Sequence, residues 1–230
     1  MVPIVLVPGL LCSAEVFAPQ IPALWPQGPV TVASTLSGET IAEIAAAILA
    51  AAPSRFALAG ISMGGYVSLE IMRQAPQRVL KLALLDTSAR PDTAEQTAQR
   101  LDLIERARGG NFEALAAPLM AAIAHPSRRD DRALGEINLR MIRAIGFAGF
   151  MRQTRAIVGR IDSRPSLAAI SVPTLALVGD SDPFTPPECS EEIVAAIPNA
   201  RLDVAPQCGH ASTLEQPEFV NRALLEWIAW

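Results

Sequence analysis

Residues 55–65 read Arg-Phe-Ala-Leu-Ala-Gly-Ile-Ser-Met-Gly-Gly, and this is the most specific pattern in the chain. Its first part, Arg55–Ile61, is an apolar run of strand length. A helical pattern follows over Met63–Ala75 and ends at Pro76. A strand that passes into a helix through Gly-x-Ser-x-Gly is typical of a tight turn that holds the serine in a strained backbone conformation. We therefore expect the hydroxyl of Ser62 to project beyond the end of a strand.

The glycines of this turn have a steric role, because side chains at Gly60 or Gly64 would collide across so tight a bend. The helix begins directly after Ser62. Its positive N-terminal end and the backbone N–H of Met63 therefore face any negative charge that develops on a bound carbonyl oxygen. The pattern predicts a nucleophilic serine with one oxyanion donor at Met63.

Short apolar runs alternate with helical patterns on both sides of this turn. Uninterrupted apolar strands joined by helices indicate a parallel sheet covered by helices on both faces. We expect an α/β fold with a mainly parallel sheet of about six strands. These strands are Ile4–Val7, Val30–Ser34, Arg55–Ile61, Lys81–Asp86, Thr174–Val178 and Arg201–Val204. The expected helices are Glu39–Ala52, Met63–Ala75, Glu191–Ile197 and Glu218–Trp230.

Residues 91–165 interrupt the alternation, since they contain helical patterns but no convincing strand. The helical stretches are 94–108, 112–124 and 132–158, the last softened by Gly146 and Gly149. We predict a helical cap over residues 91–165, inserted in a core domain made of residues 1–90 and 166–230. Such a cap would cover the carboxyl edge of the sheet, where ligands bind in folds of this kind.

The chain has two histidines, and a serine nucleophile needs an imidazole to accept its proton near neutral pH. His210 follows Gly209 directly after the last expected strand, so it can reach the sheet edge that carries Ser62. His125 precedes Pro126 within the cap, where a partly exposed position at a helix end explains it more simply. His210 is therefore the expected base.

A carboxylate should orient the imidazole and stabilise its charged form. The best candidate is Asp182, on the loop after the strand Thr174–Val178, which gives the chain order Ser, Asp, His. Asp180 and Asp86 are alternatives, and Asp86 is the more serious because it also ends a strand. Either could instead hold a turn.

The loop after the first strand should supply the second oxyanion donor. Its sequence is Val7-Pro8-Gly9-Leu10-Leu11-Cys12, where the glycine allows close backbone approach and leaves the N–H of Leu10 pointing inward. Substrate contacts are expected at Leu11, Cys12, Leu119 and Phe147, although packing is the simpler explanation for most apolar side chains of the cap.

The stretch from Arg128 to Arg164 contains nine arginines and four carboxylates, so it is basic in a chain of net charge −4. A basic cap could attract an anionic substrate or an acidic carrier protein, but a solvated helix face is the more common explanation. The chain has no basic stripe with interleaved aromatics, so we do not expect nucleic-acid binding.

We expect neither a signal peptide nor a membrane span, because the apolar run Ile4–Val7 is short and the helix candidate Ile41–Ala52 contains Glu43. Three scattered cysteines favour neither a disulfide framework nor a zinc site. A cytoplasmic location is the default expectation.

Together, the Val-Pro-Gly-Leu loop, the Gly-Ile-Ser-Met-Gly-Gly turn, the Gly-x-x-Asp at 179–182 and the late Gly-His resemble the α/β-hydrolase superfamily over nearly the whole chain. The chain looks most like small serine carboxylesterases and lactonases. It differs in having Pro8-Gly9 where many relatives have His-Gly, and in starting at the family's third strand. The serine at position 62 disfavours the members that use an aspartate nucleophile.

The resemblance implies cleavage of a small-molecule ester through an acyl-enzyme, with Ser62, His210 and Asp182 as triad and no metal or organic cofactor. Lactone or thioester hydrolysis, C–C bond hydrolysis or a lyase reaction with the same triad stays open, as does a non-catalytic ligand sensor.

Overall fold

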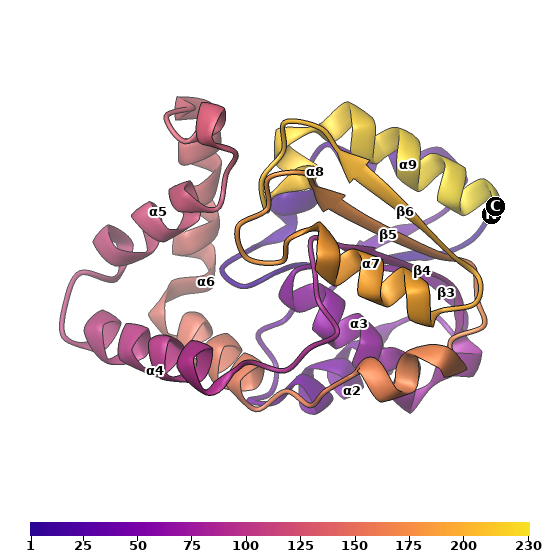
Figure 1. The fold of residues 1–230 in the computed structure, drawn as a ribbon, viewed down its shortest axis with the longest axis horizontal. Coiled ribbons are helices and arrows are strands. Elements are labelled where there is room, and N and C mark those ends of the chain that lie inside the picture. Colours follow the sequence, from indigo (N-terminus) through magenta and orange to yellow (C-terminus); the bar gives the residue numbers. More distant parts are fainter.

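The computed structural model describes all 230 residues, and its centre is a six-stranded parallel sheet (Figure 1). The strand order is β2-β1-β3-β4-β5-β6, and every neighbouring pair is parallel. The strands are β1 Ile4–Val7, β2 Val30–Val32, β3 Phe56–Ile61, β4 Val79–Leu85, β5 Thr174–Gly179 and β6 Ala200–Ala205. The expected α/β fold with about six mainly parallel strands is confirmed.

The central strands are buried on both faces, because their side chains alternate between two hydrophobic clusters. In β1, Ile4 and Leu6 belong to one cluster and Val5 and Val7 to the other. Strands β3 and β4 alternate in the same way. This double burial explains why the central strands read as continuous apolar runs in the sequence.

Helices cover both faces of the sheet (Figure 1). One face packs against α1 Gln20–Leu24 and α9 Pro217–Ala229, whose Trp227 is fully buried. The other face packs against α2 Ile41–Ala51, α3 Met63–Gln74 and α7 Pro187–Ala196. No helix is both long enough and apolar enough to cross a membrane.

Three helices lie between β4 and β5, and we call them the helical insertion: α4 Ala94–Arg108, α5 Phe112–Ala122 and α6 Arg132–Val158. They stand to one side of the sheet (Figure 1). The stretch contains no strand, and the exact limits of a cap at 91–165 stay a prediction. The short helix α8 Ser212–Glu215 completes the fold near the C-terminus.

Several elements begin or end at residues other than those expected from the sequence. Strand β2 stops at Val32, two residues before the expected end, and β4 begins at Val79, two residues earlier than expected. Helix α7 starts at Pro187, whereas Glu191 was its expected first residue. The earlier start is possible because proline is tolerated in the first helical turn. The short helices within residues 14–27 were not expected, since they are too brief to show a helical period.

Helix α6 bends at Gly146, whose backbone angles are φ 64° and ψ 174°. Only glycine adopts this region readily. A Cβ atom at Gly146 would meet no atom within 4 Å, and the same holds for Gly135 near the start of α6, which has a helical backbone. The two glycines therefore differ in backbone conformation rather than in available space.

This difference yields a matched pair of substitutions. We expect Gly146→Ala to lower the free energy of unfolding by about 1–3 kcal/mol, because alanine is strained at that φ and ψ. Gly135→Ala should raise it by about 0.5–1 kcal/mol, since alanine is the better helix former. Urea unfolding followed by circular dichroism measures both values. Equal effects of the two substitutions would contradict a backbone-driven bend at Gly146.

Candidate active site

The turn between β3 and α3 holds Ser62 at φ 55° and ψ −116°, a conformation that non-glycine residues rarely adopt. A Cβ atom at Gly60 would collide with the carbonyl oxygen of Gly64, and one at Gly64 would collide with that of Val7. The start of α3 therefore lies directly against the end of β1. This close approach turns the chain sharply enough to leave the serine at the carboxyl edge of the sheet.

The end of β4 and the segment that follows it hold the turn in place through two hydrogen bonds. The N–H of Ser62 donates to the carbonyl oxygen of Leu85 over 2.9 Å, and the hydroxyl of Thr87 donates to the carbonyl oxygen of Ser62 over 2.7 Å. The strained backbone of Ser62 is thus fixed on both sides of its Cα atom.

His210 lies in the loop after β6 and contacts Ser62 across the sheet edge. Its Nε2 is 2.8 Å from the Oγ of Ser62, and its Nδ1 is 2.7 Å from Oδ2 of Asp182. The imidazole is buried. Three side chains from the ends of β3, β5 and β6 therefore form one continuous chain of hydrogen bonds.

Asp182 is held by its own loop. Its Oδ1 accepts hydrogen bonds from the N–H groups of Phe184 (2.8 Å) and Thr185 (3.0 Å), and the Thr185 hydroxyl donates to Oδ2 over 2.8 Å. The side chain of Asp182 is fully buried. This loop presents one carboxylate oxygen to the imidazole in a single orientation.

The alternative carboxylates hold loops and do not contact the imidazole. Asp86 accepts hydrogen bonds from the N–H groups of Gly179 (3.2 Å) and Ser212 (3.0 Å). Asp180 accepts from the N–H groups of Gln207 and Cys208. Burial, together with the neighbouring Asp182 charge, raises the pKa of Asp86 to about 8.

The pKa values of His210 and Asp182 move in opposite directions. Burial opposes protonation of His210, but the charge and hydrogen bond of Asp182 outweigh burial and raise the pKa of the imidazole. Burial likewise works against the charged form of Asp182. The imidazole and the loop N–H groups overcome it and lower the pKa of this carboxyl. Asp182 therefore stays ionised beside a histidine of increased basicity.

The loop after β1 lies against Ser62. A Cβ atom at Gly9 would sit 3.3 Å from the Cβ atom of Ser62, so a side chain there would crowd the nucleophile position. The N–H groups of Leu10 and Met63 donate no hydrogen bond within the protein. Two backbone donors beside Ser62 are thus available to a ligand oxygen.

Gln153 fixes this loop, although the sequence analysis did not single it out. Its Oε1 accepts the N–H of Leu11 over 3.1 Å, and its Nε2 donates to the hydroxyl of Thr35 over 2.8 Å. Leu11 itself has a φ of 62°, and Gln153 is fully buried. The contact joins residues 142 positions apart and comes from the part of α6 that follows the bend at Gly146, and no local sequence pattern reveals it.

Glu215 was also missed, and it joins the histidine loop to the helical insertion. Its buried carboxylate accepts hydrogen bonds from the N–H groups of Gly209 (3.2 Å), Ala211 (3.2 Å) and His125 (2.8 Å). The imidazole of His125 contacts Ser127, two residues along the chain. His125 therefore lies outside the chain of hydrogen bonds formed by Ser62, His210 and Asp182, in agreement with its expected position at a helix end.

A cavity of about 600 Å³ opens at Ser62 and His210, between the sheet edge and the helical insertion. Leu11 and Leu119 line it, as do Leu10, Leu103, Met120 and Ile123. Cys12 and Phe147, two other expected substrate contacts, do not. The Sγ of Cys12 turns back toward the carbonyl oxygen of Leu10, and Phe147 packs edge-on against Phe112.

Two further observations bear on ligands. No group of three or more histidine, cysteine, aspartate or glutamate side chains is placed so that it could hold a metal ion. Most of the arginines counted between Arg128 and Arg164 form ion pairs at the surface, such as Arg132–Glu136 and Arg143–Glu113. Of these nine arginines, Arg160 alone lines the cavity.

Known proteins share this architecture. A thermophilic esterase from Thermogutta terrifontis, solved with malate bound, is 29% identical and superposes with a TM-score of 0.88 over 100% of this chain and 90% of its own. The enol-lactonase from Burkholderia xenovorans LB400 shares the fold, with 23% identity and a TM-score of 0.90 over 99% of this chain and 91% of its own.

Among curated sequences, a Mycobacterium tuberculosis protein provisionally named non-heme bromoperoxidase BpoC is 30% identical over 196 residues, which cover 82% of this chain and 74% of the relative. Residues 2–217 match the family described as alpha/beta hydrolase fold. The chain is therefore a member of the α/β-hydrolase family.

Proposed function

We propose that this protein is a serine hydrolase that cleaves carboxylic esters of small or medium acyl groups through an acyl-enzyme. The observation that carries the proposal is the chain of hydrogen bonds from the Oγ of Ser62 through His210 to Asp182, with distances of 2.8 and 2.7 Å. A hydroxyl, an imidazole and a buried carboxylate in this order can activate an oxygen nucleophile at neutral pH.

In the first half-reaction, Ser62 attacks the ester carbonyl while Nε2 of His210 accepts its proton. Asp182 keeps the other proton of the ring on Nδ1 and stabilises the imidazolium that forms. The backbone N–H groups of Leu10 and Met63 stabilise the negative charge on the carbonyl oxygen, helped by the N-terminal end of α3.

The intermediate collapses when the imidazolium of His210 protonates the leaving alcohol, which breaks the C–O bond and leaves the acyl group on Ser62. Water then enters, His210 accepts one of its protons, and the hydroxide attacks the acyl carbonyl. The proton returns to Ser62 as the acid is released. The apolar side chains in the cavity, Leu11 and Leu119 among them, suit a short acyl chain.

Membership in a hydrolase family and the likeness to an esterase at 29% identity support this proposal. The same site can attack lactones, which are cyclic esters, so a substrate panel should include both. The expected site residues are the ones predicted from the sequence: Ser62, His210 and Asp182, with Leu10 and Met63 as backbone donors.

The nucleophile and the base can be tested directly. We expect hydrolysis of p-nitrophenyl butyrate, with kcat reduced on the order of 10⁴-fold or more in Ser62→Ala and in His210→Ala. His125→Gln is the matched control, because its ring contacts Ser127 rather than Ser62, and it should keep nearly full activity. Undiminished turnover in Ser62→Ala would end the proposal, and so would failure of a fluorophosphonate to label Ser62 in the wild-type protein.

The acid can be identified from the pH dependence. His210 must be neutral to accept the Ser62 proton, so kcat/KM should fall as the pH drops through the pKa of His210. Because Asp182 raises this pKa, the midpoint should lie above the ordinary value of 6.5. Asp182→Asn should lower the pKa of the imidazole, seen by proton NMR, and reduce kcat about 10⁴-fold. Asp86→Asn should change the pKa of the imidazole and kcat less than Asp182→Asn does. A larger effect of Asp86→Asn on these two quantities would identify Asp86 as the acid.

Gln153 should act through the loop that it holds. Gln153→Leu removes the acceptor for the N–H of Leu11, so the N–H of Leu10 is less well aligned with the carbonyl oxygen. We expect kcat to fall about tenfold with little change in KM, because the oxyanion forms only in the transition state. A change confined to KM would instead indicate a role in substrate binding.

A further inference from the structure

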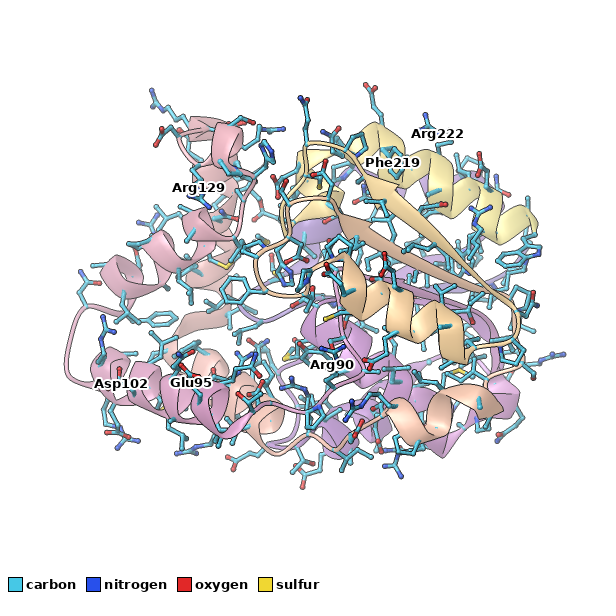
Figure 2. All side chains as sticks on the ribbon, viewed as in Figure 1. Arg90, Glu95, Asp102, Arg129, Phe219 and Arg222 are labelled. Carbon is cyan, nitrogen blue, oxygen red and sulfur yellow. The ribbon has the colours of Figure 1, made fainter.

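One part of the cavity wall is cationic. Three arginines line the cavity, Arg90, Arg100 and Arg160, against a single carboxylate, Asp92. They come from the segment after β4, from α4 and from the end of α6. Figure 2 places Arg90 where the helical insertion meets the core, and its guanidinium pairs with Glu192 over 2.8 Å. Its charge is thus compensated by a residue outside the cavity.

The other two arginines share one carboxylate. Arg100 Nε lies 2.8 Å from Oδ2 of Asp92, and Arg160 Nη1 lies 2.7 Å from Oδ1. The side chains of Asp92 and Arg160 are 2% and 7% exposed. Two cations against one anion leave a net positive charge at this wall. Arg100 carries the excess, because its side chain is 25% exposed and the more deeply buried Arg160 already pairs with Asp92, so a bound anion would compensate this charge.

A structural role explains only part of this cluster. Arg160 also donates to the carbonyl oxygens of Arg90 and Ile157, so it ties the end of α6 to the segment after β4. Asp92 would already be neutralised by Arg160 alone. Arg100 is therefore not needed for charge balance, and its two Nη groups form no hydrogen bond within the protein.

A buried hydroxyl in the same cavity also has no partner. Thr154 on α6 lines the cavity, is 1% exposed, and its Oγ1 forms no hydrogen bond. Buried hydroxyls in proteins are almost always hydrogen-bonded. The oxygen atom itself is covered by protein, so this hydroxyl belongs to the packing behind the cavity wall and not to the surface that a ligand would contact.

The cationic wall lies close to the nucleophile. Tyr66 lines the cavity one turn of α3 after Ser62, a rise of about 5.4 Å along a helix. The guanidinium carbon of Arg160 sits 4.3 Å from the centre of the Tyr66 ring. The apolar side chains of Leu103 and Ile157, each one helical turn from Arg100 or Arg160, line the same cavity.

We propose that the cavity selects esters whose acyl chain ends in a second, ionised carboxylate, which binds Arg100 with help from Arg160. Methylene groups between the two carbonyl carbons would contact Leu103 and Ile157. The preferred substrates are then half-esters of short dicarboxylic acids. This inference rests on the ester hydrolysis proposed above, and it adds to that proposal the charge of the substrate.

The kinetic test compares p-nitrophenyl hydrogen glutarate with p-nitrophenyl valerate, whose acyl chain has the same number of carbons but no charge. Arg100→Gln should reduce kcat/KM for the glutarate ester about tenfold and change the valerate value less than about twofold, the range expected for a hydrogen bond to a charged group. Arg100→Lys should recover part of the loss. Arg106→Gln is the matched control, because Arg106 lies on the same helix with an exposed side chain.

A binding test separates this inference from the proposed function. Calorimetry with Ser62→Ala should detect glutarate binding that weakens with added salt and is lost on further substitution of Arg100 by glutamine. If wild-type protein hydrolyses neither ester while Ser62→Ala binds glutarate through Arg100, ester hydrolysis fails and the anion site stands. Equal effects of Arg100→Gln and Arg106→Gln on both esters, or glutarate binding that is independent of Arg100, would overturn the anion site.

Discussion

The hydrogen bond between the Oγ of Ser62 and Nε2 of His210 joins residues 148 positions apart, and the rest of the site depends on it. A parallel sheet makes this contact possible, because the carboxyl ends of all its strands meet at one edge. The strand order places β3, β4, β5 and β6 side by side. Ser62, Asp86, Asp182 and His210 then follow four neighbouring strands, and loops of a few residues suffice to bring them together.

Carboxylates act as fixed acceptors for the backbone N–H groups at this edge, and Asp86 and Glu215 among them are buried. Asp86 accepts hydrogen bonds from the N–H groups of Gly179, at the end of β5, and Ser212, beyond β6, and Asp180 and Glu215 accept others near His210. Loops carry few backbone partners of their own, so an acceptor with two oxygens can hold two loop segments at once. Burial, and after it the nearby charge of Asp182, raises the pKa of Asp86, whereas Asp182, the one carboxylate hydrogen-bonded to the imidazole, stays ionised.

Features that depend on a local pattern or on the order of residues along the chain could be predicted from the sequence. Apolar runs revealed the six strands, and glycine spacing around Ser62 revealed the turn. The placement of Asp182 and His210 after late strands anticipated that they would meet Ser62. Contacts between distant elements left no such signal. Gln153 lies in the interior of a helical pattern, and its hydrogen bond to Leu11 exists only because α6 packs on the loop after β1. The excess of arginines between Arg128 and Arg164 was equally uninformative about the cavity. Most of these arginines form ion pairs at the surface, and Arg100 lies outside this stretch.

The helical insertion takes part in placing His210, the proposed base, and also forms part of the cavity wall. The N–H of His210 donates to the carbonyl oxygen of Ile123 over 2.9 Å, just beyond the end of α5. A Cβ atom at Gly209 would collide with the backbone at His125, so the two segments touch without any side chain between them. Glu215 adds a hydrogen bond across the same boundary. An outward movement of α5 would break these contacts and release the histidine loop. Backbone contacts thus connect the wall near His210 to the core, whereas the wall formed by α4 is connected through buried apolar side chains and through the ion pairs of Asp92. In this arrangement the position of His210 depends on backbone contacts with the helical insertion, and the positions of the residues that would contact the far end of a substrate depend on side-chain contacts.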